Sequence, residues 1–529
     1  MPLSHRSLVV LAVLPTAFLF ALFVYPVATI IWTGLTVEGG FSVNAFVDLL
    51  SRSSIRRAAW FTLWQALVST AVTLALGLPG AYLFGRYEFP GRRILLSLIT
   101  IPFVLPTVVV ASAFLALTKG WFDIDAPVPT VIAAHAFFNY AVVVRTVSAA
   151  WSRLDPSLEQ AAAVLGASPA RVMRSVTLPR LRGSITAAAA IVFLFTFTSF
   201  GVVLIVGEGR LRTLEVETYL QTVQLLNLPL AAALAIVQLV FITATLVAYS
   251  RLRTSQSSLR PARRKSIRRD TLVFAGWNLL VIVFLLVLPL AALIERSLRI
   301  GDRYGLDHYR SLTTAGPIGS PAEAIQNSLG FSLVALAIAV TIGALAAAVV
   351  SYGRGRRSAR LFDSLLMLPL GTSAVTIGFG FLVALDRPID LRTWWLLVPL
   401  SHSLVALPLV VRTVAPVMAG IPNQLREAAS TLGASPARVW TRIDLPIVWR
   451  SWLVAAGFAF AISLGEFGAT SFIARPATTT MPTMIFRFLS RPGEANFGSA
   501  MAMSVVLMVV TGTAILAIDR FRIARVGEF

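Results

Sequence analysis

Two copies of one octapeptide, LGASPARV, decide the fold of this chain. The first copy stands at residues 165–172 and the second, unchanged, at residues 432–439, which is 267 positions later. The same offset pairs His135 with His402. A chance match between apolar segments is excluded, because the octapeptide lies in a polar loop. Self-similarity at a fixed offset indicates a duplicated structural unit, so the chain is predicted to contain two copies of one domain.

Around each octapeptide the chain is far more apolar than a water-soluble protein. Hydrophobic residues make up 57% of the 529 positions and charged residues only 13%, whereas a soluble domain carries about 25% charged residues. Apolar runs long enough to cross a hydrocarbon core of about 30 Å are expected at 8–34, 60–85, 95–117, 128–150, 184–206, 229–250, 272–294, 327–352, 361–385, 394–414, 451–473 and 499–519. The composition excludes a secreted or cytosolic enzyme and a disordered chain, and it predicts an all-α integral membrane protein with twelve transmembrane helices.

The repeat and the spans together predict two tandem domains of six helices each. The first domain is expected at 1–250, a basic cytoplasmic linker at 251–271 and the second domain at 272–529. Six crossings return the chain to the side from which it started, so both domains have the same orientation. The two domains are therefore expected to be related by a two-fold axis along the membrane normal.

The formal net charge of +21 is interpreted as a signal of membrane topology. With the N-terminus placed in the cytoplasm, most of the 45 basic residues fall in cytoplasmic segments, and the external loops are nearly neutral. The positive-inside rule then places both termini in the cytoplasm. The basic run at 251–271 has Ser and Pro between its charges, so it is expected to be solvated and to contact anionic lipid. Nucleic acid is not an expected partner.

Each octapeptide belongs to a polar segment between the fourth and fifth spans of its half, on the cytoplasmic side. The segment reads LEQAAAVLGASP from residue 158 and LREAASTLGASP from residue 425. The alanine-rich part favours a helix, the glycine ends that helix, and Ser-Pro begins another one. We therefore predict two short coupling helices at an angle in each half. An amphipathic helix that only seals the membrane boundary is the alternative, but it gives no reason for the octapeptide to recur at the same depth.

Glu-Ala-Ala, then Gly, then a polar stretch ending in Leu-Pro, resembles the cytoplasmic loop of the permeases of binding-protein-dependent ABC importers. The resemblance covers essentially the whole chain, as two permease domains in tandem. It implies that the loops dock on a separate ATP-binding subunit, expected to be a dimer, and that an extracytoplasmic solute-binding protein delivers the solute. The loop residues implied are Glu159, Gln160, Ala161, Ala162, Gly166, Glu427, Ala428, Ala429 and Gly433. Because Gln160 stands where the motif has Glu, docking in the first half either rests on Glu159 or is asymmetric.

No catalytic residue, metal or cofactor is expected in this chain. A phosphate-binding loop needs Gly-Lys-Ser/Thr, and neither Lys119 nor Lys265 follows a glycine. ATP hydrolysis is therefore expected in a separate subunit. The chain has no cysteine and four histidines outside any HExxH pattern, which argues against a membrane-embedded enzyme. An ion-coupled secondary carrier is the other alternative, although it normally has several charged residues at the membrane midplane.

Polar residues inside spans are the candidates for the solute path, because polar groups at membrane depth are costly and usually face a cavity or another helix. The candidates are His135, Asn139, His402 and Glu466. For the histidines the alternative is a structural hydrogen bond, and for Glu466 it is the balance of an arginine. The residue equivalent to Glu466 is Ser199, so this charge is not symmetric.

Fused twelve-span permeases of this kind resemble two groups, the importers of thiamine and of ferric iron. The stretches HAFFN from residue 135, TLEVETY from residue 213 and GEFG from residue 465 look more like the thiamine permeases. A cationic aromatic solute would also suit Glu466 and the aromatic residues. The resemblance thus implies thiamine import across a bacterial plasma (inner) membrane, with ferric iron as the alternative solute.

Overall fold

The computed structural model describes residues 5–37, 40–252, 265–266, 272–316, 319–353, 355–386 and 390–519. Over these residues the chain is built almost entirely from helices, and its strands are three pairs of two residues each. Ten helices are long and apolar enough to cross a membrane, or up to twelve if two bent helix pairs each count as one span. The upper number agrees with the twelve spans expected from the sequence.

In the first half the helices are α1 (His5–Leu19), η1 (Phe20–Val24), α2 (Tyr25–Leu35), α3 (Asn44–Ser51), α4 (Ser53–Arg86), α5 (Arg92–Val104), α6 (Thr107–Leu115), η2 (Ala116–Trp121), α7 (Pro127–Trp151), α8 (Pro156–Val164), α9 (Pro169–Val172), η3 (Met173–Thr177), α10 (Leu178–Phe197), α11 (Gly201–Gly207), α12 (Leu214–Tyr219), η4 (Leu220–Gln224) and α13 (Leu228–Leu252).

In the second half they are α14 (Leu272–Val281), η6 (Ile282–Val287), α15 (Leu288–Leu298), α16 (Asp307–Ser311), α17 (Pro321–Tyr352), α18 (Arg357–Met367), η7 (Pro369–Gly371), α19 (Ala374–Ala384), α20 (Leu397–Gly420), α21 (Asn423–Thr431), α22 (Pro436–Val439), η8 (Trp440–Asp444), α23 (Leu445–Gly465), α24 (Thr470–Ile473), η9 (Pro476–Thr478), α25 (Met481–Leu489) and α26 (Glu494–Asp519).

The strand pairs are β1 (Thr36–Val37) with β2 (Gly40–Phe41), β3 (Tyr87–Glu88) with β4 (Lys265–Ser266), and β5 (Arg299–Ile300) with β6 (Arg303–Tyr304). The pairing of β3 with β4 is parallel, and the other two are antiparallel. Apart from β4 and the last turn of α13, the expected linker at 251–271 lies outside the described residues.

The third and ninth expected spans, 95–117 and 361–385, are not straight helices, because each is divided into two helices that meet at 98°. In the first half the break falls at Leu105, whose backbone is extended before Pro106. Proline lacks an N–H and disfavours helical backbone in the residue before it. The equivalent of Pro106 in the second half is Ser373, whose hydroxyl accepts hydrogen bonds from two amides of α19 and so begins that helix. Different residues thus produce the same bend.

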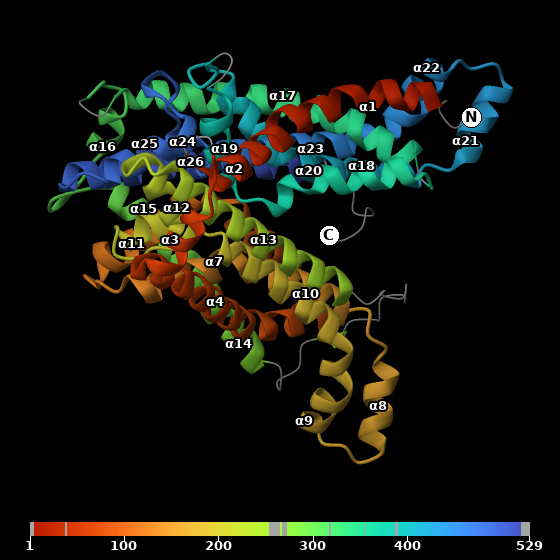
Figure 1. Cartoon of the computed structure of the whole chain (residues 1–529). Coiled ribbons are helices and arrows are strands. Elements are labelled where there is room, and N and C mark those ends of the chain that lie inside the picture. Colours follow the sequence, from red (N-terminus) through yellow and green to blue (C-terminus); the bar gives the residue numbers. More distant parts are fainter. Residues whose placement is uncertain are drawn as a thin grey trace.

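The first span of each half packs against the opposite half. α1 lies along α17 and α2 against α19, while α14 lies along α4 and α15 against α6 (Figure 1). Across this exchange the hydroxyl of Tyr140 on α7 donates a hydrogen bond to Asn278 Oδ1 on α14 at 2.8 Å. Gly380 on α19 leaves room for Pro26 on α2, because a Cβ at this glycine would lie 3.0 Å from the proline. The two sequence repeats therefore form one interlocked body.

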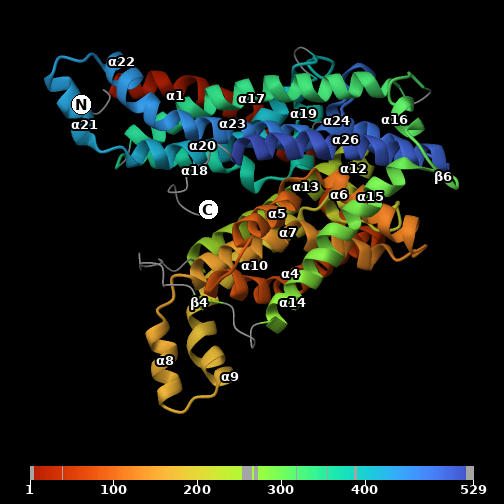
Figure 2. The same ribbon diagram turned by 180° about the vertical axis from the view of Figure 1, so that it is seen from behind.

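Equivalent residues meet where the two halves join, as a two-fold relation requires. The rings of Phe200 and Phe467, which the 267-residue offset pairs, are stacked with centroids 5.4 Å apart and planes inclined by 21°. From this contact the halves diverge towards the ends that carry α8 and α9 in the first half and α21 and α22 in the second. Both views show the two helix pairs at the same end of the molecule but on opposite sides of it (Figures 1 and 2).

Large apolar side chains lie on the outer surface of the spans. Val10, Trp32 and Trp60 expose 71%, 68% and 66% of their surface. Exposed apolar surface on this scale is unfavourable in water but suits contact with lipid chains. The spans thus present the surface that a bilayer requires.

Candidate coupling loops and translocation path

The two cytoplasmic loops have the helix–glycine–helix form that their sequences predict. Gly166 and Gly433 end α8 and α21 with φ of +82° and +80°, in the left-handed region that favours glycine. After each turn a serine precedes the next helix, and Ser168 Oγ accepts a hydrogen bond from the amide of Arg171 at 3.4 Å. No residue of α8 or α21 is buried, and both loops project beyond their bundles (Figures 1 and 2).

The tips of both loops expose apolar side chains to water. Leu165 and Leu432, which are equivalent residues, are each 87% exposed, and Val164 is 88% exposed. Gln160 and Glu427, also equivalent, are exposed on α8 and α21. A paired surface of this kind, with small alanines beside exposed leucines, offers two equivalent sites at which another protein can pack.

The residue just before Gln160 and Glu427 points inward in both halves. Glu159 forms an ion pair with Arg86 at the end of α4 and accepts a hydrogen bond from Thr177 Oγ1 at 2.8 Å. Its equivalent, Arg426, forms an ion pair with Asp444, at 2.9 Å between Nε and Oδ1. The sequence analysis did not single out Arg86, Arg426 or Asp444. The signal available was that the offset aligns acidic Glu159 with basic Arg426 and neutral Thr177 with acidic Asp444, so that a base and an acid appear together in the second half.

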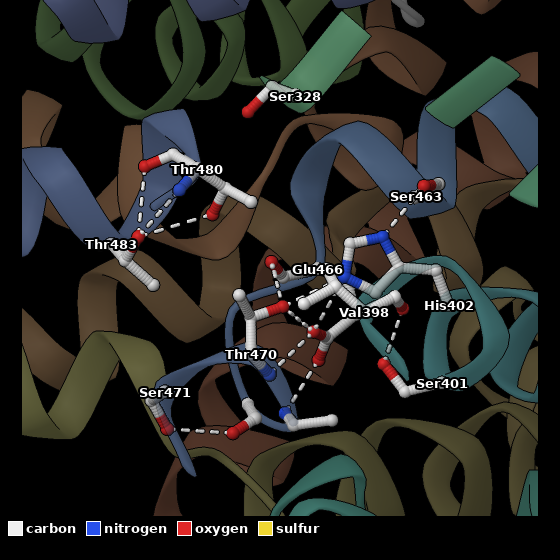
Figure 3. Close-up of polar contacts among 12 residues, drawn as sticks. Ser328, Val398, Ser401, His402, Ser463, Glu466, Thr470, Ser471, Thr480 and Thr483 are labelled. Atoms are coloured by element: carbon white, nitrogen blue, oxygen red, sulfur yellow. Dashed lines mark hydrogen bonds and ion pairs between the residues drawn. The ribbon is translucent and has the colours of Figure 1, made fainter. Parts of the chain in front are cut away.

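The two histidines expected on the solute path are buried and have protein partners. His135 lies between the hydroxyls of Ser69 and Ser199, at 3.0 and 2.7 Å, and is 3% exposed. His402 lies between the hydroxyls of Ser463 and Thr470, both at 2.8 Å, and is 1% exposed (Figure 3). In each half the histidine ties the fourth span to the point where the fifth span breaks.

Glu466 uses its carboxylate to organise the break after α23 (Figure 3). It accepts hydrogen bonds from the amides of Ala469 and Thr470, at 2.8 and 3.0 Å, and from the Thr470 hydroxyl. His402 Nε2 lies 3.4 Å from the same carboxylate. Ser199, the equivalent of Glu466, provides only a hydroxyl beside its histidine.

Asn139 lies one turn beyond His135 on α7. Its Nδ2 donates a hydrogen bond to the backbone carbonyl of His135 at 3.0 Å, and its buried Oδ1 has no hydrogen-bond partner among the described residues. The arginines near the other end of this span and its equivalent bind neighbouring helices. Arg145 donates to Thr100 Oγ1 at 3.0 Å, and Arg412 lies 3.5 Å from an Asp363 oxygen.

An aromatic cluster surrounds the contact between the halves. Tyr219 packs against Phe200 at 5.4 Å and against Phe472 of the other half at 5.5 Å. Phe486 in turn packs against Phe467 at 5.6 Å. The cluster therefore joins both halves along the expected two-fold axis. It was not predicted from the sequence, because its members come from three helices, α12, α24 and α25, and from the two breaks that contain Phe200 and Phe467.

Two further carboxylates beside this cluster are fully buried. Glu215 and Glu217 on α12 are 0% and 1% exposed. Gln238 Nε2 donates to Glu215 Oε1 at 2.5 Å, and Gln221 Nε2 donates to Glu217 Oε1 at 2.7 Å. Both glutamates belong to the TLEVETY stretch, but their burial depends on how α12 packs on α13 and α19. Among the described residues no group of three or more His, Cys, Asp or Glu side chains is arranged to hold a metal ion.

Comparison with known proteins assigns both halves to one family. The sequence model of the family described as "Binding-protein-dependent transport system inner membrane component" matches residues 77–258 and 339–526, together more than half of the chain. The chain is 29% identical over 520 residues to the thiamine transport system permease protein ThiP of Brucella abortus (strain 2308), with 93% of this chain and 91% of that relative covered.

Other similar proteins carry related names. ThiP of Escherichia coli (strain K12) is 24% identical, with 81% of this chain and 82% of that relative covered. The probable ABC transporter permease protein y4fN of Sinorhizobium fredii (strain NBRC 101917 / NGR234) is 24% identical, with 93% and 92% covered. A crystal structure of a bacterial ABC transporter involved in the import of the acidic polysaccharide alginate matches 47% of this chain and 96% of its own chain, with 16% identity and a TM-score of 0.36.

Proposed function

The chain belongs to the family of binding-protein-dependent transport system inner membrane components, and we propose that it is the membrane subunit of an ATP-driven importer whose solute is thiamine. It is a multi-pass permease of the inner membrane, as its family is. The finer proposal covers the ATP-binding subunits, the external solute-binding protein and the solute. Both termini are proposed to lie in the cytoplasm, as the distribution of basic residues favours.

The observation that carries this proposal is the pair of exposed coupling loops. They stand at equivalent positions of the two family matches, at the same end of the molecule, and each exposes a leucine that is 87% accessible. A dimeric ATPase presents two equivalent grooves, and two equivalent loops on a pseudo-symmetric permease suit such a partner. We propose that Gln160, Ala161, Ala162 and Gly166 dock on one ATPase subunit, and Glu427, Ala428, Ala429 and Gly433 on the other.

Alternating access follows from moving these loops together. The halves diverge towards the loops and meet at the aromatic cluster (Figure 2). Closure of the ATPase dimer would bring the loops together, and the bundles would then turn about their contact at Phe200 and Phe467. Packed interfaces switch between discrete arrangements rather than deforming continuously, so the stacked rings are proposed to separate when the cytoplasmic side closes.

Thiamine is the favoured solute because the relatives ThiP are named for it and because the site where the halves meet is aromatic. A cation is attracted to the face of an aromatic ring, which suits a cationic aromatic solute. The four residues expected on the path, His135, Asn139, His402 and Glu466, are proposed to support the wall of that path. Their own hydrogen bonds hold the broken spans on which the aromatic cluster is mounted.

The proposal is tested by purifying the full chain from its native membrane and measuring ATP-dependent uptake of radiolabelled thiamine by vesicles that contain the complex. We expect an ATP-hydrolysing subunit to purify with the chain and to crosslink to a cysteine placed at Ala428. Glu427→Arg should reduce both capture of that subunit and uptake. Glu323→Arg is the control. It reverses an exposed charge in the first turn of α17, at the end opposite Tyr352, and should leave the ATPase bound. Uptake by vesicles that contain no ATP-hydrolysing partner would overturn the proposal.

A further inference from the structure

The coupling loop of the first half is held to its bundle by a nearly buried ion pair. Arg86 is the last residue of α4, and Glu159 is on α8; their side chains are 9% and 22% exposed. Thr177, at the end of η3, donates its hydroxyl to the other oxygen of the Glu159 carboxylate at 2.8 Å. One carboxylate thus joins the end of the second span, the coupling helix and the beginning of the fifth span.

The loop of the second half is held at the same place by different residues. Asp444, at the end of η8, pairs with Arg426 on α21, and their side chains are 3% and 12% exposed. The hydroxyl of Tyr352, the last residue of α17, donates to Asp444 Oδ2 at 2.6 Å. The guanidinium of Arg426 also lies over the Tyr352 ring, 4.9 Å from its centroid. The same three segments are joined, and the centre of the contact is again a carboxylate.

The polarity of the two contacts is opposite. In the first half the coupling helix supplies the acid, Glu159, and the base comes from the end of the second span. In the second half the coupling helix supplies the base, Arg426, and the acid comes from the beginning of the fifth span. Because Glu159 and Arg426 are equivalent by the repeat, the coupling helix carries opposite charges in the two halves, and its charged partner comes from a different segment in each.

Such contacts matter here because the coupling helices pack only loosely on their bundles. No residue of α8 or α21 is buried, so apolar packing does not hold them against the bundle. A nearly buried ion pair fixes geometry strongly, since removing one partner leaves an uncompensated charge in a desolvated place. The side chains that fix the loops are thus distinct from the exposed Gln160 and Glu427.

We propose that these contacts are latches, latch 1 formed by Arg86, Glu159 and Thr177 and latch 2 by Tyr352, Arg426 and Asp444. They set the angle of each coupling helix on its bundle, so that a push on the loop turns the bundle instead of bending the loop. Glu159 is therefore a positioning residue rather than a substitute for the missing motif glutamate at 160. This inference rests on the proposed function for its consequence in transport, but the latch itself is measurable without a partner.

The test uses two matched pairs of spin labels. The chain has no native cysteine, so Leu165→Cys with Arg93→Cys reports on the first loop, and Leu432→Cys with Arg360→Cys on the second. The labelled positions are equivalent by the repeat and are all exposed. Electron paramagnetic resonance gives the distance distribution of each pair in purified, partner-free protein. Both distributions should be narrow in the otherwise unchanged chain.

Each latch should respond to its own variant. Glu159→Gln should broaden the distribution in the first loop only, and Asp444→Asn that in the second loop only. Glu427→Gln, which removes an exposed charge from the same loop, should change neither. Arg86→Glu should broaden the first distribution, and the double variant R86E/E159R should restore it because the ion pair is re-formed with reversed polarity.

An unchanged first distribution in Glu159→Gln, or a double variant as broad as Arg86→Glu alone, would overturn the inference. If these side chains only filled space, exchanging their charges would not make the distance distribution narrow again. If Glu159→Gln does not yield folded protein, Thr177→Val removes only the hydrogen bond from the hydroxyl, leaves the ion pair in place and should broaden the first distribution to a smaller extent. No change in that variant would count against the latch.

The consequence for transport is measured separately. In vesicles with the ATPase and the binding protein, Glu159→Gln should lower the thiamine moved per ATP hydrolysed by roughly tenfold, a size typical of the coupling between two sites. R86E/E159R should recover most of it. Failure of the unchanged chain to move thiamine would count against the proposed function alone, because the spin-label distances judge the latches independently.

Discussion

The coupling loop of the first half and that of the second share a backbone but differ in the side chains that maintain it. Both turn at a glycine with φ near +80° and both carry the same octapeptide. The inward-facing residue is acidic in one loop, Glu159, and basic in the other, Arg426. The beginning of the coupling helix differs as well, since Asp155 caps α8 through its side chain and the equivalent Pro422 provides no such cap for α21.

The turn of the coupling loop is fixed in both halves, whereas the side chains that hold the loop are interchangeable. The left-handed turn needs glycine in both copies, because any other residue is strained there. The ion pair can change both its sign and the segment that supplies the partner: Arg86 at the end of α4 pairs with Glu159, whereas Asp444 at the end of η8 pairs with Arg426. The attraction depends only on the product of the two charges and their separation. After duplication, therefore, the backbone conformation has been kept residue by residue, while the latch has been kept only as a contact.

We expect the largest difference in stability between equivalent variants of the two halves at Glu466 and its equivalent Ser199, which lie deeper in the membrane than the loops. Glu466→Ala would leave two amides without their acceptor and remove one of the acceptors of the Thr470 hydroxyl, so the free energy of unfolding should fall by about 3 kcal/mol. Ser199→Ala removes one hydroxyl contact to His135 and should lower it by about 1 kcal/mol. Thermal unfolding of both variants in detergent measures the difference. Equal losses of unfolding free energy in the two variants would mean that Glu466 stabilises its break no more than Ser199 stabilises the equivalent one.

The loop glycines should instead behave alike. Gly166→Ala and Gly433→Ala should each destabilise the turn by about 1–2 kcal/mol, the strain of a left-handed conformation in an L-residue. No atom lies within 4 Å of a Cβ at either position, so the strain is confined to the backbone. Amide hydrogen exchange in α8 and α21 should rise by similar factors. Markedly different factors would indicate that the two latches contribute unequally to the turns.

The helix caps offer a pH test of the same comparison. The amide of Ser157 donates to the Asp155 carboxylate and lowers its pKa below the usual value, with a smaller effect from Arg180. A lowered pKa means that the cap stabilises α8 above the unfolded pKa of about 3.9 and that this stabilisation is lost as the pH falls through the folded pKa. Exchange in α8 should therefore accelerate relative to α21 in acid.

Asp155→Ala is the control for that measurement. The variant lacks the titrating cap, so at neutral pH its α8 should already exchange faster than in the unchanged chain, and the part of the acid response that Asp155 causes should disappear. An acid response of α8 that is identical with and without Asp155 would contradict this assignment of the cap.

The smallest effect is expected at the exposed positions. Gln160→Glu gives the first loop the motif glutamate of the second, and Glu427→Gln does the reverse. A single exposed charge contributes about 0–1 kcal/mol to an ion pair, so uptake should change by less than about fivefold in either variant. Measured uptake that falls by a much larger factor in only one of them would show that the two loops dock in different ways.

Local chemistry in the sequence was sufficient for the coupling loops. Alanine-rich helix, Gly166 and Ser168-Pro169 each act within a few residues, and the predicted helix–glycine–helix form is confirmed. The duplication and the resemblance to binding-protein-dependent importer permeases are also confirmed by the two family matches. Mean hydropathy and run length located the spans, but both 98° bends were missed. Membrane helices tolerate an internal proline such as Pro106, and a serine that begins a helix, such as Ser373, is a weaker signal still.

Contacts between segments that are distant in the chain could not be predicted from the sequence in this way. From the sequence, docking in the first half was expected either to rest on Glu159 or to be asymmetric. The inward contact of Glu159 was not considered, because its partner Arg86 lies 73 positions earlier in the chain. The exchange of first spans was likewise absent from the division at 1–250 and 272–529, since both arrangements satisfy the same hydropathy pattern. The roles of the coupling and path residues remain predictions that the variants above can test.

By itself the sequence determined the class of the protein, its two parallel units and the shape of its loops, because apolar run length, charge asymmetry and turn chemistry act locally along the chain. Three features became visible only in the tertiary structure. The Glu466 carboxylate accepts hydrogen bonds from nearby backbone amides, Phe200 stacks on Phe467, and the inward-facing residue of the coupling loop is acidic in one half and basic in the other. Most of these features arise from residues that are far apart in the chain and meet only after the helices pack. A sequence pattern describes near neighbours along the chain and does not predict such contacts.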